Sequence, residues 1–288
     1  GPEPELNESI EKSLAGTREF IELVQGLNKS TVTPVISPRY GLGVSWDLLV
    51  QLGDLAREYN LPVQTHVDEN PLEIQAVAER FPNTTSYVDL YAQTGLLNVS
   101  HMILGHCVHV TDDEISEMLQ HPGVGCAPNP LSNFALTSGI APIRHYLNRG
   151  LPVGLGTDAS GGYSSSALDS MRSAITGSKA LYFQNNRSEE WAHLDYDSAL
   201  YLATKGSADI MGLGNTIGLI KPGYQWDALE IDIMAPGSPP AMDFNTEAGK
   251  HGPKYTFDQI VSKFIYEGDD RNIVKVWVDG QKVKDTRA

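Results

Sequence analysis

The stretch PVQTHVDENP, residues 62–71, decides the fold class that the sequence predicts. It begins as a short β-prone run, and its end carries the signals of a helix start. Asn70 is a preferred N-cap residue, Pro71 is favoured at the first helical position, and Glu73 follows three residues after the cap. A strand that passes directly into a helix is the repeating unit of a parallel α/β sheet.

The same change from a short apolar run to a helical pattern recurs along the chain, at intervals of roughly 25 to 40 residues that suit βα units. The runs expected to be strands are 31–37, Pro62–Val67, Met102–Cys107, Val124–Ala127 and Pro152–Gly156. The helices expected are 6–27, 45–59, one that starts after Asn70, one from the capping box at Thr111 to about His121, 140–148, 166–184 and 197–212. Several runs end in polar, titratable residues, as strands do at the C-terminal rim of a β/α barrel. The sequence therefore predicts an α/β fold, a partial (β/α)8 TIM barrel of about five β/α units.

The pattern changes after residue 213. A turn followed by a strand is expected near Trp226–Leu229, and residues 273–283 are expected to form a β-hairpin. Its Asp279-Gly280 dipeptide is typical of a type I′ turn. We therefore predict a barrel segment over residues 1–213 and a C-terminal β-sandwich segment, with a helix or loop that packs on the barrel, over residues 214–288.

The charge balance narrows the classes of partner. The 288 residues carry a formal net charge of −15, which argues against nucleic acid or an anionic membrane as a partner. No apolar run is long enough to span a bilayer, and the acidic start is unlike a signal peptide, so a cytoplasmic location is expected. Cys107 and Cys126 lie in apolar runs and are expected to be buried, reduced thiols.

Four titratable residues stand where a metal site could form. His66, His106 and Asp158 lie at or just after the C-terminal ends of three predicted strands, and Glu69 follows His66 by three residues. Histidine and carboxylate side chains hold catalytic Zn2+, which lowers the pKa of a bound water. A nearby carboxylate can then carry the proton of that water to a leaving group. The four residues together predict a metal-assisted hydrolase.

Each residue alone has a simpler interpretation. A histidine at a strand end can be structural, Glu69 can favour the positive N-terminus of the next helix, and Asp158 can cap the turn that follows it. Their joint occurrence at successive strand ends favours the catalytic interpretation. The side chain of His109 should diverge from that of His106 on a strand-to-loop segment, so we expect His109 to be a surface or supporting residue.

Several motifs resemble those of the amidohydrolase superfamily, and within it the guanine deaminase family. The segments similar to the ends of the superfamily's fifth, sixth and eighth strands are THVDEN (65–70), GHC (105–107) and GLGTD (154–158). The segments similar to T-P-R-F, G-T-D-x-A-G-G-Y-S and G-D-D-R-N-I of guanine deaminases are SPRY (37–40), GTDASGGYS (156–164) and GDDRNI (268–273). The resemblance covers residues 6–284 and implies strands 4–8 of the barrel.

The resemblance implies a zinc-dependent hydrolytic deamination of guanine to xanthine and ammonia. It implies that His66 and Asp158 ligate Zn2+, that Glu69 shuttles protons and that His106 contacts the metal-bound water. Asp158 also suits an acceptor for the attacking hydroxide.

The same resemblance assigns the purine to the SPRY segment. Arg39 would hydrogen-bond the base, and Tyr40 stands where an aromatic ring could pack on the purine plane. A guanidinium fork suits the carbonyl-bearing edge of a neutral purine.

The chain departs from the family pattern in two places. The His-x-His ligand pair of the first strand is missing, together with a nearby glutamine that contacts the purine, and no His-x-His spacing occurs anywhere in the chain. The family's H-C-P-x-S-N pattern appears as GCAPNPLSN (125–133), which replaces the histidine and lengthens the loop. With two of four ligands, we expect zinc to be absent or weakly bound and the chain alone to be inactive.

Two hypotheses follow. The chain is either part of a guanine deaminase whose remaining ligands come from other sequence, or a non-catalytic amidohydrolase-like scaffold or interaction module. A third possibility, a different amine or amide substrate, depends on Arg39. Five strands do not close a barrel, and parallel sheets are normally covered at their edges. We therefore expect self-association or a protein partner at the open edge.

Overall fold

The computed structural model describes residues 8–188, 191–239 and 255–287. A parallel sheet in the order β1-β2-β3 forms its first layer, from Val63–Val67, Met102–His106 and Val124–Ala127. Val67 lies opposite His106, and Gly105 lies opposite Ala127. The strand ends therefore meet at one edge of the sheet.

The first and last predicted strands are shorter than expected. Ile36 forms an isolated parallel bridge to Val63, and Val153 forms one to Cys126. The five predicted segments therefore lie side by side in chain order, but only the inner three are strands among the described residues. The outer two each have one neighbour, and the prolines beside them cannot donate to a ladder.

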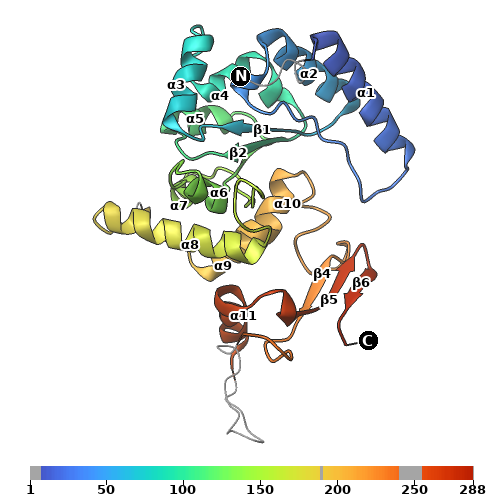
Figure 1. Cartoon of the computed structure of the whole chain (residues 1–288), viewed down its shortest axis with the longest axis vertical. Coiled ribbons are helices and arrows are strands. Elements are labelled where there is room, and N and C mark those ends of the chain that lie inside the picture. The colour runs from blue at the N-terminus through green and yellow to red at the C-terminus, as the bar shows by residue number, and fades with distance from the viewer. Residues whose placement is uncertain (1–7, 189–190, 240–254, 288) are drawn as a thin grey trace, which may run out of the picture.

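Helices surround this sheet and connect its strands (Figure 1). Their bounds are α1 Ile10–Gly26, α2 Trp46–Tyr59, α3 Pro71–Arg80, α4 Tyr87–Gln93, α5 Asp112–Met118, α6 Pro130–Ala135, α7 Ile143–Asn148, α8 Ala167–Gln184, α9 Tyr196–Tyr201, α10 Ser207–Ile210 and α11 Phe257–Glu267. The Asn70 side chain accepts from the Glu73 amide, which confirms the predicted start of α3. The sequence analysis did not identify α4 and α6. Residues 6–7 of the first predicted helix lie outside the described residues.

Two predicted helices have different bounds in the structure. The helix expected from residue 140 begins only at Ile143, because Pro142 occupies its N-cap. The helix expected over 197–212 is divided by a π-helical turn at Leu202–Gly206. Gly206 lies against the sheet there, since a Cβ at this position would be 2.4 Å from the Val153 carbonyl oxygen. The close approach explains the glycine at this position.

A second sheet lies well apart from the first, with α8 and α9 between them (Figure 1). It is antiparallel, in the order β4-β5-β6, from Ala228–Ile231, Ile273–Val278 and Gln281–Asp285. Asp279 and Gly280 both have positive φ, 48° and 75°, as the predicted type I′ turn requires. Arg172 of α8 donates to the Ile265 carbonyl of α11 at 2.7 Å and so fastens this region to the first layer. The boundary at residues 213 and 214 stays a prediction.

The core lies between the parallel sheet and its helices. In β1 the residues Val63, Thr65 and Val67 are buried, whereas His66 on the other face is only half-buried. This alternation directs His66 away from the packed layer and toward a cavity. No helix among the described residues is long and apolar enough to cross a membrane.

Candidate active site

The ends of β1 and β2, together with the segment after Val153, bring four side chains together. The His66 and His106 rings lie 4.8 Å apart between centroids, tilted by 36°. His106 Nε2 lies 3.8 Å from Glu69 Oε2 and 3.9 Å from Asp158 Oδ2. These separations are too long for direct hydrogen bonds, so a water or a substrate atom can lie among the four groups.

All of the site residues named from the sequence line one cavity of about 420 Å³. Its lining residues are Arg39, Tyr40, Leu42, His66, Glu69, Asn70, Glu73, His106, Leu136, Asp158 and Gly161. Glu73 and Leu136 are additions that sequence reasoning missed. Leu136 follows α6, where the chain departs from the family pattern, and its position depends on tertiary packing.

The backbone turns sharply where the strands end. His106 and Asp158 have φ values of 70° and 46°, in the left-handed region that non-glycine residues seldom adopt. Such conformations cost free energy and cluster at functional sites. Gly161 makes room for the Asp158 carboxylate, since a Cβ there would lie 2.6 Å from Asp158 Oδ2.

Two buried polar residues hold the reactive groups in place. Asn133 Oδ1 lies 2.9 Å from His106 Nδ1, and the Ser138 hydroxyl donates to Glu69 Oε1 at 3.0 Å. The sequence analysis quoted Asn133 only as part of a motif, and it did not identify Ser138. Both contacts join residues far apart in the chain, so no local spacing could reveal them.

Burial sets the charge of His66. It lowers the pKa of the imidazole, and the neighbouring His106 ring lowers the pKa further. The Arg39 carbonyl and the carboxylates of Glu69 and Asp158 act in the opposite direction. His66 is therefore held toward its neutral form, which is the form that binds a metal.

The Arg39 segment is fastened to β1 by its backbone, while its side chain stays available. The Arg39 carbonyl accepts from the His66 amide at 3.2 Å, and the Tyr87 hydroxyl accepts from the Gly41 amide at 2.8 Å. The guanidinium lies 5.8 Å from the centre of the Tyr40 ring. Among the described residues no carboxylate forms an ion pair with Arg39, so its guanidinium is available to a ligand in the cavity.

The donor set matches zinc in type and is incomplete in number. A catalytic zinc site takes three protein ligands and leaves a position open. His66 and Asp158 offer an imidazole and a carboxylate, but the described residues contain no group of three or more His, Cys, Asp or Glu side chains arranged to hold a metal ion. Among the described residues, His66 and Asp158 therefore offer two side chains of the types that bind zinc, without a complete ligand set.

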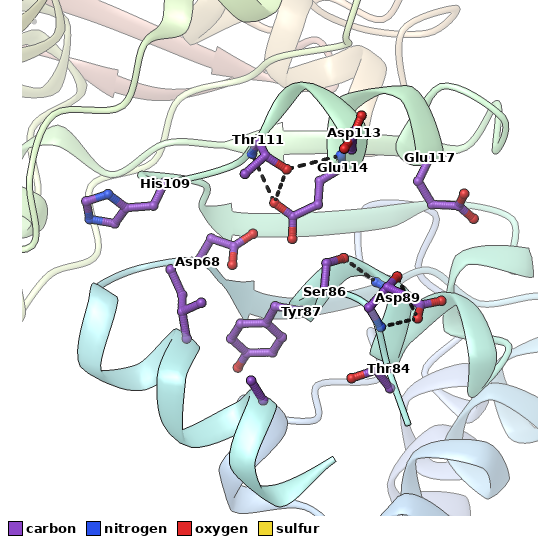
Figure 2. A pocket seen from close by; sticks show the side chains of 13 residues that line it. Asp68, Thr84, Ser86, Tyr87, Asp89, His109, Thr111, Asp113, Glu114 and Glu117 are labelled. Atoms are coloured by element: carbon purple, nitrogen blue, oxygen red, sulfur yellow. Dashed lines mark hydrogen bonds between the residues drawn. The ribbon is translucent and has the colours of Figure 1, made fainter. Parts of the chain in front are cut away.

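A second cavity, of about 590 Å³, lies beside the site between α3, α4 and α5 (Figure 2). Asp68 and Glu114 turn their carboxyl groups toward one another there, and Asp68 is 1% exposed. Burial raises the pKa of Asp68 to about 9, and the charge of Glu114 adds to the effect. Asp68 is therefore a protonated acid at neutral pH in the folded chain.

The proton on Asp68 makes the stability of the folded chain depend on pH. An unfolded chain releases it near pH 3.9, whereas the folded chain keeps it to about pH 9. The free energy of unfolding therefore falls as pH rises between these values, by up to about 1.4 kcal/mol per pH unit. Asp68→Asn removes this dependence. The free energy of unfolding in urea, taken as variant minus wild type, should therefore increase from pH 5 to pH 8.

A matched control is Asp113→Asn, which changes an exposed acid of the same cavity. It separates the effect of Asp68 from that of removing any acid at this cavity. An Asp68→Asn difference that does not change with pH would show that Asp68 is ionised in the folded chain.

Comparison with known proteins identifies the class of protein. The model of the amidohydrolase family matches residues 3–283. The chain therefore belongs to the amidohydrolase family.

Individual relatives are more specific. A probable guanine deaminase from Schizosaccharomyces pombe is 38% identical over 284 residues, which are 98% of this chain and 52% of the relative. The crystal structure of guanine deaminase from C. acetobutylicum, with guanine bound in its active site, superimposes with a TM-score of 0.85 at 33% identity, covering 97% of this chain and 62% of that one. An adenosine deaminase from Xanthomonas campestris with bound zinc shares the fold, with a TM-score of 0.79 at 23% identity over 96% of this chain and 57% of its own.

The chain thus spans 52% of the S. pombe relative's length and 62% of the bacterial chain's length. What these proteins bind and catalyse is therefore a basis for proposals about this chain.

Proposed function

We propose that this chain carries the substrate-binding and proton-transfer part of a zinc-dependent guanine deaminase. The observation that carries the proposal is one cavity that brings His66, Glu69, His106 and Asp158 together with the guanidinium of Arg39. The chain would supply about five β/α units, strands 4–8 of a (β/α)8 barrel, followed by the C-terminal segment from residue 214.

His66 and Asp158 would hold the zinc, with further ligands from sequence outside this chain. Zinc, when bound, would lower the pKa of the attacking water. The other residues act on the organic groups. Glu69 takes a proton from the water and returns it to the departing amino group, and the Ser138 hydroxyl holds its carboxylate in place. Guanine and water thereby become xanthine and ammonia.

Arg39 and Tyr40 would recognise the purine. A guanidinium donates two parallel hydrogen bonds to the carbonyl oxygen and ring nitrogen on one edge of guanine. The Tyr40 ring lies beside it and offers an apolar face for the base plane. Since no protein carboxylate neutralises Arg39 among the described residues, binding the purine breaks no internal ion pair.

The open edge of the sheet would be covered by the missing β/α units. A cavity of about 590 Å³ lies beside α1 and α2, and its lining includes Phe20, Val35 and Arg39. Phe20 is 53% exposed and Leu23 of the same helix is 67% exposed. The S. pombe relative has about half its length outside the match to this chain, which is enough sequence for this role.

The experiment on Arg39 uses a fusion protein. It joins this chain to the part of the S. pombe relative that lies outside the match, in the order the relative has them; we call it the fusion. Arg39→Ala in the fusion should lower kcat/KM for guanine by roughly 10- to 100-fold, because a bidentate contact to the guanine edge is lost. The loss on 2-aminopurine, which lacks the carbonyl, should be only a few-fold.

Arg39→Lys is the matched variant, since it keeps the charge and loses the planar fork. Its kcat/KM for guanine should be closer to that of Arg39→Ala than to that of the wild type. If Arg39→Ala lowered kcat/KM equally for guanine and 2-aminopurine, Arg39 would not recognise the carbonyl edge of the purine.

The alternative function is a non-catalytic scaffold or interaction module, favoured by the incomplete ligand set. Native mass spectrometry of the assembly from its source separates the two. An enzyme requires a polypeptide with His-x-His at the open edge, whereas a scaffold would carry an unrelated protein or a second copy of this chain there.

A further inference from the structure

We infer that the segment Asn129–Gly139, which contains α6, positions the side chains of His106 and Glu69 relative to each other. The inference deepens the proposed function and rests on it for its catalytic meaning. Asn133 contacts the His106 ring, and Ser138 donates to the Glu69 carboxylate. One short segment thus contacts both groups that would act on the attacking water.

The two contacts are mechanically linked. The Asn133 carbonyl accepts from the Ser138 amide at 2.8 Å, and the Asn133 amide donates to the Asn129 carbonyl at 2.9 Å. Asn133 is 1% exposed and Ser138 is 5% exposed, so neither side chain can turn into solvent. A displacement of the segment would therefore change the Asn133–His106 and Ser138–Glu69 contacts together.

Asn133 also selects one form of the His106 ring. Its Oδ1 accepts from Nδ1–H, which leaves Nε2 directed at Glu69 and Asp158. A ring without this acceptor can rotate or move its proton to Nε2. Either change alters whether His106 presents a hydrogen-bond donor or an acceptor to the cavity. The hydrogen bond made by one ring nitrogen commonly fixes the role of the other.

Ser138 acts through Glu69. Its hydroxyl occupies Oε1, while Oε2 is the oxygen that faces His106. The carboxylate is thereby held with one oxygen anchored and the other free to exchange protons. Without the anchor, Glu69 would sample other rotamers and spend less time facing the water.

The first test needs neither zinc nor guanine and uses this chain alone. Nitrogen-15 NMR of labelled histidine should show His106 with its proton on Nδ1. In Asn133→Leu that signal should shift toward the Nε2–H form, whereas in Asn133→Asp, which keeps an acceptor oxygen, Nδ1 should keep its proton. An unchanged His106 signal in Asn133→Leu would overturn the inference, whatever the fate of the proposed function.

The second test measures coupling in the fusion. Ser138→Ala should lower kcat by roughly tenfold with KM nearly unchanged, and Ser138→Thr should restore most of it. On a Glu69→Gln background Ser138→Ala should cause no further loss, because the group it positions no longer transfers protons. Additive losses would show that Ser138 acts on the fold and would overturn its assignment.

The matched control is Ser178→Ala. Ser178 is buried to a similar degree, at 6% exposed, and its hydroxyl donates to the Ile175 carbonyl of its own helix. It should leave kcat and KM within about twofold of the wild type, as expected for residues that make no contact in the site.

Discussion

Purified by itself, the 288-residue chain is expected to hold zinc only substoichiometrically and to release no ammonia from guanine. His66 and Asp158 are the only two ligands that we assign to it. Burial favours the neutral form of His66 that binds a metal, but two ligands do not complete a site. Each missing ligand removes both a bond and the preorganisation that a catalytic site needs. Metal analysis after dialysis, together with an ammonia assay at high protein concentration, measures both quantities.

The fusion is the control for this result. It should retain about one zinc ion per chain, as a site with a complete ligand set does, under the same dialysis. His66→Ala in the fusion should return the zinc content to that of the chain alone. Tight zinc and turnover by the isolated chain would mean that ligands outside our assignment complete the site.

Replacing Glu69 by glutamine should cause a large loss of rate in the fusion without loss of zinc. The amide keeps the size of the side chain and can still meet the Ser138 hydroxyl, but it cannot take a proton from water. Positioned acid–base groups contribute up to about 10⁴-fold, so kcat should fall on the order of 10³-fold while KM changes little. Zinc content should remain at the wild-type value, since Glu69 is not assigned as a ligand.

The control for this variant is Glu79→Gln, on an exposed part of α3 where Glu79 accepts from Gln75. It should leave kcat and KM unchanged within error. A loss of less than tenfold in Glu69→Gln would assign proton transfer to another group, and Asp158 would be the first to examine.

Much of the sheet could be predicted because local chemistry specifies it. The strands β2 and β3 are largely apolar, β1 alternates buried and half-buried residues, and the N-cap and proline at Asn70-Pro71 mark where the next helix begins. The residues His66, His106 and Asp158 were found because they lie at or just after the ends of predicted strands, and parallel strands place their ends on one edge.

Other features depend on contacts that a linear sequence does not display. The six-residue helix α6 has no amphipathic period long enough to detect, and its N-cap makes no side-chain hydrogen bond. Asn133 and Ser138 reach residues 27 and 69 positions away, and only the folded chain brings them there. The outer strands at Ile36 and Val153 are reduced to single bridges because each has one neighbour.

The most direct test is the stoichiometry of guanine turnover by the fusion. If this chain supplies the substrate and proton-transfer part of a deaminase, the fusion should produce one xanthine and one ammonia for each guanine consumed. Production should stop when a chelator removes the zinc and return when zinc is restored. A folded fusion that holds one zinc ion per chain and leaves guanine unchanged would contradict the account.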